Sequence, residues 1–128
     1  KTMSDIHREV KPVRAEAVLT GSYVAGTDLQ VRSDYNQAFL YCYFTLGSLT
    51  SLEIKVESTI DGTNFVQETN LSISGATGTL TKGEYTITTG GNFKIAVPMS
   101  CHTLRVSAKG TGTVTSSLLQ IDALLTYV

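Results

Sequence analysis

The stretch "SLEIKVESTIDGTNF", residues Ser51–Phe65, alternates apolar and polar side chains before it reaches a turn dipeptide, Asp61-Gly62. The apolar positions share one parity: Leu52, Ile54, Val56 and Ile60. The polar positions share the other: Glu53, Lys55, Glu57 and Thr59. Successive side chains of a strand point to opposite faces of a sheet, so the alternation predicts a strand with one buried face and one solvated or partner-facing polar stripe.

The same pattern repeats along the chain, with Gly, Asn and Asp between the alternating runs and almost no helical periodicity. It predicts strands at Val13–Leu19, Asp28–Arg32, Gln37–Thr45, Leu52–Ile60, Phe65–Thr69, Glu84–Thr88, Asn92–Val97, Thr103–Lys109 and Val114–Tyr127. We therefore expect one all-β domain over residues 12–128, an antiparallel β-sandwich of about eight to nine strands, jelly-roll-like or immunoglobulin-like. Its core should contain Leu52, Ile54, Val56, Leu104, Val106, Leu119, Ile121 and Leu125.

The two ends of the chain depart from this pattern. Residues 1–11 have no clean period and mix both charge signs, so we interpret them as an arm, either a frayed terminus or a segment that docks on a neighbouring subunit. The last strand is apolar on both parities, as in a central strand or a subunit contact. The candidate subunit contacts are Ile6, Val10, Leu118, Leu124 and Val128.

The composition excludes several classes of function. The 128 residues carry a formal net charge of -1, which provides no field for holding phosphates, so we expect no nucleic-acid partner. No apolar run approaches the roughly 20 residues that a membrane helix needs, and the N-terminus lacks the apolar region of a signal peptide. We therefore expect neither a membrane partner nor a signal peptide in this chain.

No catalytic or metal motif is present, so we expect no enzyme and no cofactor. Asp61 is the only carboxylate of its loop, too few for a calcium site. Glu53 and Glu57 would stand about 13 Å apart along a strand, beyond the separations that glycosidases use. Cys42 and Cys101 have no metal or redox spacing, and free thiols or a disulfide both remain open.

The tyrosines supply a second kind of candidate site. Tyr41 and Tyr43 share parity with Phe39, which favours an aromatic face of the core. Tyr23 and Tyr35 fall in expected loops, where an aromatic ring can stack on a sugar. Together with Asp61 and Asn64 they form the predicted surface-binding set.

Two long segments carry a resemblance to a known class. "LTGSYVAGTDLQVRSDYNQAFLYCYFTLGSLTSLEIKVESTIDGTNF" and "NFKIAVPMSCHTLRVSAKGTGTVTSSLLQIDALLTYV" resemble small β-sandwich virion structural proteins of tailed bacteriophages. The shared features are a strand of the form "EIKVExSxDGxNF" and a late strand of the form "LRVSAKGTGTVT". The resemblance covers about residues 17–128 and leaves the arm outside.

The resemblance implies a non-enzymatic, multi-copy component of a virion, made in the host cytoplasm, either a capsid decoration protein or a head–tail connector, collar or fibre-base component. Its partners would be capsid, portal or tail proteins and further copies of itself. The alternative is a secreted carbohydrate-binding or cell-surface adhesion module, in which the predicted surface-binding set would hold a glycan.

Overall fold

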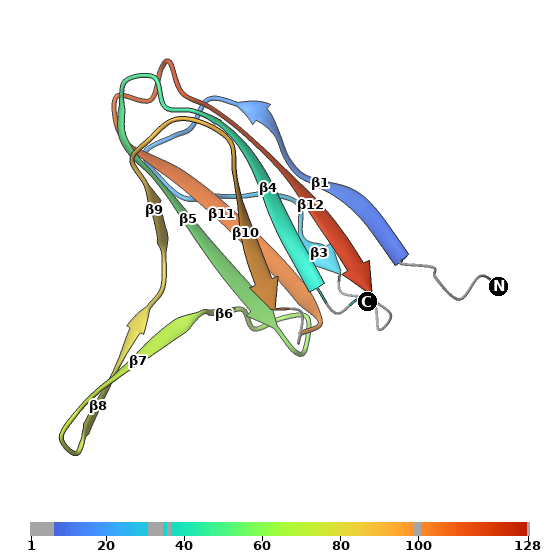
Figure 1. The fold of residues 1–128 in the computed structure, drawn as a ribbon, viewed down its shortest axis with the longest axis vertical. Helices are drawn as coiled ribbons and strands as arrows, with labels where there is room; N and C mark the ends of the chain where they lie inside the picture. The colour runs from blue at the N-terminus through green and yellow to red at the C-terminus, as the bar shows by residue number, and fades with distance from the viewer. Residues whose placement is uncertain (1–6, 31–34, 36, 99–100, 128) are drawn as a thin grey trace.

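The computed structural model describes residues 7–30, 35, 37–98 and 101–127 of the chain. Within these residues every helix or strand that is present is a β-strand, and every strand pair is antiparallel. Two sheets pack face to face and a separate hairpin projects from them (Figure 1). The predicted all-β sandwich is confirmed.

Sheet A has the order β1–β12–β4–β10. Its strands are β1 (His7–Ala17), β12 (Leu118–Tyr127), β4 (Gln37–Thr45) and β10 (Phe93–Pro98). The strand nearest the C-terminus thus lies between the first strand and β4, which makes it a central strand.

Sheet B has the order β2–β11–β5–β6, with β3 also on β11 and β9 also on β5. Its long strands are β5 (Leu49–Thr59) and β11 (Thr103–Gly112), which pair with Val56 opposite Val106. The other strands are short: β2 (Val24–Ala25), β3 (Leu29–Gln30), β6 (Val66–Gln67) and β9 (Tyr85–Ile87).

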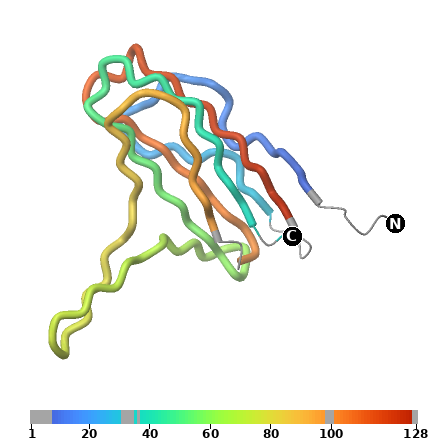
Figure 2. The backbone as a smooth tube through the Cα atoms, in the orientation of Figure 1, coloured from blue at the N-terminus to red at the C-terminus, as the bar shows by residue number. Residues whose placement is uncertain are grey.

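The third sheet is the hairpin of β7 (Thr69–Ser74) and β8 (Thr77–Lys82). It leaves the body after β6 and returns to β9, and it points away from both sheets (Figures 1 and 2). All twelve residues of the two strands are exposed.

The core lies between the two sheets and takes one parity from each long strand. All eight residues predicted for the core are buried, with at most 3% of any of them exposed. Sheet A adds Leu40, Cys42 and Ala123 to the same core. The parity prediction is wrong for Ile60, which is 86% exposed because β5 ends at Thr59 and the alternation no longer applies beyond it.

The structure differs from the expected boundary between arm and sandwich at residue 12. β1 begins at His7 and pairs along β12, with Arg8 opposite Thr126 and Val10 opposite Leu124. Residues 7–11 thus belong to sheet A, while the rest of the expected arm lies outside the described residues. An edge strand can hold such a sequence, because it buries little and tolerates Pro12, which lacks an N–H for the ladder.

The strand count also exceeds the expected eight to nine, since the described residues form twelve strands. The excess comes from two-residue strands and from the β7–β8 hairpin, whose sequence "NLSISGATGTLTK" reads as a Thr/Gly-rich excursion. The two-residue strands have no side-chain pattern of their own and arise from backbone pairing, whereas the hairpin strands do alternate, with Leu71, Ile73 and Leu80 between short polar residues.

We expect Ile54→Ala to lower the free energy of unfolding by about 2–5 kcal/mol, because the side chain is fully buried and its removal leaves a cavity. Ile60→Ala is the matched control and should change the same quantity by less than about 0.5 kcal/mol, because Ile60 is exposed. Urea unfolding of both variants measures the difference. Equal losses would contradict this assignment of the core.

Candidate interaction surface

The outer face of sheet A, which points away from sheet B, is formed by the second parity of its strands. In β4 the even positions Ala38 to Phe44 are buried, so Phe39, Tyr41 and Tyr43 point outward. The prediction that these three rings form a core face is therefore wrong. The side chains of β4 that pack between the sheets are instead Ala38, Leu40, Cys42 and Phe44.

The strand register arranges this outer face in rows across all four strands. One row is apolar throughout: Val10 on β1, Leu124 on β12, Phe39 on β4 and Ala96 on β10. We call it the apolar row. The adjacent row contains Pro12, Asp122, Tyr41 and Lys94. Val10 and Ala96 are exposed, and Leu124 and Phe39 are half-buried, so solvent reaches the whole apolar row.

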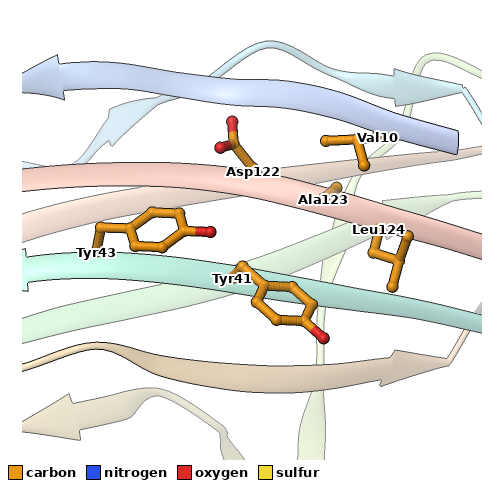
Figure 3. Close-up of a pocket in the computed structure, with 6 residues that line it drawn as sticks. All are labelled: Val10, Tyr41, Tyr43, Asp122, Ala123 and Leu124. Atoms are coloured by element: carbon orange, nitrogen blue, oxygen red, sulfur yellow. The ribbon is translucent and has the colours of Figure 1, made fainter.

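A shallow cavity of about 200 Å³ opens beside the apolar row, and Figure 3 shows its walls. It is lined by Val10 from β1, Tyr41 and Tyr43 from β4, and Asp122, Ala123 and Leu124 from β12. We call it the sheet A pocket. Asp122 is its one charged lining residue and accepts a hydrogen bond of 3.0 Å from Gln120 Nε2.

Lys94 supplies the positive charge on this face. Its Nζ lies 5.5 Å from the ring centroid of Phe39 and 5.7 Å from that of Tyr41, at the range where a cation is attracted to an aromatic face. The outer face of sheet A is thus an aromatic and aliphatic surface with one charge of each sign near its centre.

Two of the five predicted subunit-contact residues meet in this place, since Val10 and Leu124 both line the sheet A pocket. Leu118 has the same parity as Leu124 and is half-buried at the other end of β12, opposite Thr45. Ile6 and Val128 lie outside the described residues. That these residues contact other subunits stays a prediction.

The outer face of sheet B has the opposite character. Arg105 stands opposite Glu57 and Lys109 opposite Glu53, so charges alternate across the β5–β11 ladder. Loop residues then cover these charges: Arg105 Cζ lies 3.7 Å from the centroid of Phe65, and Tyr23 lies under Lys55 and Lys109 at 4.6 and 4.8 Å. This face has its partners within the chain.

Glu53 departs from the solvated stripe that was expected for β5. Its side chain is 8% exposed and accepts hydrogen bonds from Ser51 Oγ and from Thr111 Oγ1, the latter at 2.5 Å. These two hydrogen bonds replace the ones that the carboxylate would make to water if it were exposed. Glu57 remains half-buried beside Lys55, at 4.0 Å.

The structure does not gather the predicted surface-binding set into one patch. Tyr23 lies under Lys55, and Lys55 is about 13 Å along β5 from Thr59, the residue after which the Asp61 turn begins. The Tyr23 hydroxyl donates to Glu84 at 2.8 Å, and burial, followed by this bond, raises the pKa of Tyr23 above its ordinary value. Tyr35 lies at the β1 edge and donates to Glu9 at 2.9 Å.

Asp61 and Asn64 build a turn. The Asp61 carboxylate accepts hydrogen bonds from the backbone N–H groups of Thr63 and Asn64, both at 2.8 Å, from Asn64 Nδ2 at 2.7 Å and from Thr59 Oγ1 at 2.8 Å. These donors, with the Asn64 N–H foremost, hold the pKa of Asp61 well below its ordinary value. Gly62 has φ of 82°, which suits the residue after an Asp in such a turn.

Both cysteines are free thiols. Cys42 is fully buried in the core, and this burial raises the pKa of its thiol to about 12. Burial also raises the pKa of the half-buried Cys101. A thiol needs a lowered pKa to act as a nucleophile at neutral pH, so neither cysteine is activated.

The neighbouring His102 is engaged by a hydroxyl, with Nδ1 2.7 Å from Thr103 Oγ1. Among the described residues no group of three or more His, Cys, Asp or Glu side chains is placed to hold a metal ion. None of them belongs to a helix long and apolar enough to cross a membrane.

Comparisons with known proteins return fold similarity alone. No protein-family model matches the chain, and no curated protein matches its sequence. A chain in the structure of infectious bursal disease virus, Gx strain, is similar with a TM-score of 0.54 and 8% identity, over 95% of this chain and 32% of that one. A chain in the structure of the Gt strain gives 0.45 and 8%, over 94% and 32%.

This chain therefore spans about a third of the length of the viral chains that it matches. At 8% identity the likeness concerns the fold alone. The β fold of the chain thus resembles part of a chain from an animal virus. The two structural matches are not from tailed phages.

We predict that Asp61→Ala destabilises the protein at neutral pH and that this loss shrinks in acid. A carboxylate with a lowered folded-state pKa contributes stability that is present above its unfolded pKa of about 3.8 and disappears as the pH falls through the folded-state pKa. Urea unfolding of both proteins between pH 7 and pH 2 measures the difference. A difference that stays constant over this range would refute the role assigned to the carboxylate.

Proposed function

We propose that the protein is a non-enzymatic structural component of a virion, present in many copies, and that the outer face of sheet A is its contact surface for neighbouring virion proteins. The observation that carries the proposal is the apolar row, a solvent-reached band that crosses all four strands of sheet A. The fold likeness to a chain of a virus structure supports the viral context.

The contrast between the two sheets supports the choice of surface. Sheet B presents charged residues whose partners come from its own loops, such as Asp28, which lies 3.2 Å from Arg105. Sheet A presents Val10, Phe39 and Leu124 on its outer face. In the described part of the chain, solvent reaches all three of these side chains. Burying apolar surface contributes about 25 cal/mol per Å², so a face of this composition gains free energy when a partner covers it, whereas the charges of sheet B already have partners within the chain.

The more specific part of the proposal is a capsid decoration protein or a head–tail connector or collar component of a tailed bacteriophage. It rests on the sequence resemblance over residues 17–128, carried by the stretches "EIKVESTIDGTNF" and "LRVSAKGTGTVT". Both locations place a folded domain beside capsid or portal proteins in several copies, where each copy repeats the same contact.

We expect Val10→Lys to lower the number of copies in purified particles by about tenfold or more, because it sets a charge in the apolar row of an edge strand without touching the core. Tagged variants supplied during infection and counted by quantitative mass spectrometry of particles give this number.

Ile60→Lys is the matched control, since Ile60 is equally a large exposed aliphatic residue but lies beyond the end of β5 in sheet B. It should be incorporated like the unchanged protein. Equal incorporation of both variants would exclude the outer face of sheet A as the contact, and absence of the unchanged protein from particles would exclude the virion role.

A further inference from the structure

The β7–β8 hairpin has one aliphatic face and one polar face. Its register places Leu71 opposite Leu80 and Ile73 opposite Gly78, so the three large aliphatic side chains share one face. The other face is formed by short polar residues: Asn70, Ser72, Ser74, Thr77, Thr79 and Thr81. Leu71, Ile73 and Leu80 are 61%, 68% and 69% exposed, although this pattern is that of a sheet packed on a core.

The body of the protein does not cover this aliphatic face. Within the described residues β7 and β8 pair only with each other, and Figure 2 shows them projecting from the sandwich. An isolated two-stranded hairpin is at best marginally stable in water, and exposed aliphatic clusters of this kind mark contact surfaces. We therefore expect a second molecule, and not the sandwich of the same chain, to cover the aliphatic face of the hairpin.

The sheet A pocket of another copy has the volume and the apolar lining that such a partner surface needs. Its volume of about 200 Å³ exceeds the roughly 150 Å³ that accommodates a benzene-sized group, so it has room for a Leu or Ile side chain. Its lining is aliphatic and aromatic apart from Asp122, and the aliphatic face of the hairpin carries no charge until Lys82 at its base. The two surfaces are thus matched in size and in apolar character.

The two surfaces cannot meet within one molecule. The hairpin is an extension between β6 and β9, both on the β5 side of sheet B, whereas the pocket lies on the face of sheet A that points away from sheet B. We infer that the hairpin of one copy docks its aliphatic face on the sheet A pocket of a second copy. This inference rests on the proposed multi-copy role.

Two copies that exchange hairpins reciprocally would close as a dimer, whereas a copy that offers its hairpin to one neighbour and its pocket to another would generate a ring or an open array. The area of each contact is small: six residues on each of two strands span roughly 20 Å by 10 Å, well below the about 800 Å² per partner of a stable complex. The contact is therefore weak between free chains and becomes strong only when many are held together.

The test uses two variants of the whole chain that each disable one side of the contact. The hairpin variant is Leu71→Thr/Ile73→Thr/Leu80→Thr, which keeps residues favoured in strands. The pocket variant is Val10→Lys/Tyr43→Lys, at two exposed lining positions whose exposed fractions are 65% and 41%. The control is Ile60→Thr/Val66→Thr, which removes aliphatic side chains that are 86% and 64% exposed outside both surfaces.

Sedimentation equilibrium at up to about 1 mM protein measures self-association, and thermal unfolding verifies that each variant is folded. We expect the unchanged chain and the control to associate, and each disabled variant to associate at least about tenfold more weakly. A mixture of the two disabled variants should recover a one-to-one complex that grows no further, because one intact hairpin meets one intact pocket. If Val10→Lys/Tyr43→Lys does not fold, Val10→Lys alone serves as the pocket variant.

Four results would overturn the inference: an unchanged chain that stays monomeric throughout, a hairpin variant that associates normally, a pocket variant that associates normally, or a mixture that remains monomeric. A pocket variant that associates normally, beside a hairpin variant that does not, would point to hairpin packing against hairpin instead. None of these results concerns particles, so the virion role is judged separately by the particle counts.

Discussion

The packing of two sheets through a single layer of side chains is the constraint on which the rest of this structure depends. The β5–β11 ladder contributes Leu52, Ile54 and Val106 to that layer. From the other sheet, β4 and β12 contribute residues such as Leu40 and Ile121. A strand can give only one parity to such a layer. Every strand that enters the core therefore leaves an equal number of side chains on the outside, and their chemistry determines what the protein can contact.

The two outer faces meet this constraint in different ways. Sheet B fills its outer positions with opposite charges and covers them with rings from its loops, so that Phe65 lies on Arg105 and Tyr23 on Lys55. Even a carboxylate, Glu53, is satisfied there by hydroxyls of Ser51 and Thr111. Sheet A places aromatic and aliphatic groups outside and leaves them to solvent. In the described part of the chain, the outer positions of sheet B thus have partners from its own loops, whereas several outer positions of sheet A are open to solvent.

The sequence predicts the long strands well, because each of them buries one face in the core and therefore alternates apolar and polar residues. Gln37–Thr45 is predicted to the residue, and the buried parities of β5, β11 and β12 are right. For β4 the same reasoning fails, since both parities are apolar and the larger rings were assigned inward. The parity that faces sheet B, with Ala38, Leu40, Cys42 and Phe44, is decided only when the two sheets pack, and no single strand reveals it.

The missed elements share a different physical origin. Residues 7–11 and the β7–β8 hairpin become strands through backbone pairing, with little burial of their own. Val10 and Leu124 could be singled out from the sequence because each is an apolar residue outside the regular alternation: Val10 lies in the segment without a clean period, and Leu124 lies on the second parity of the last strand. Tyr41, Tyr43 and Asp122 join them only through the register of three strands, and Leu71 and Leu80 share a face only because the hairpin turns at Gly75.

The hairpin is also where stability and association become linked. Its twelve strand residues lose backbone freedom, at about 1–2 kcal/mol each, in exchange for one ladder of hydrogen bonds and few apolar contacts. A surface of this kind gains its missing apolar contacts only when a second molecule covers Leu71, Ile73 and Leu80. Anything that binds the ordered hairpin and not its disordered forms stabilises it by mass action. The aliphatic face thus connects the order of a projecting segment to the concentration of the molecules that can cover it.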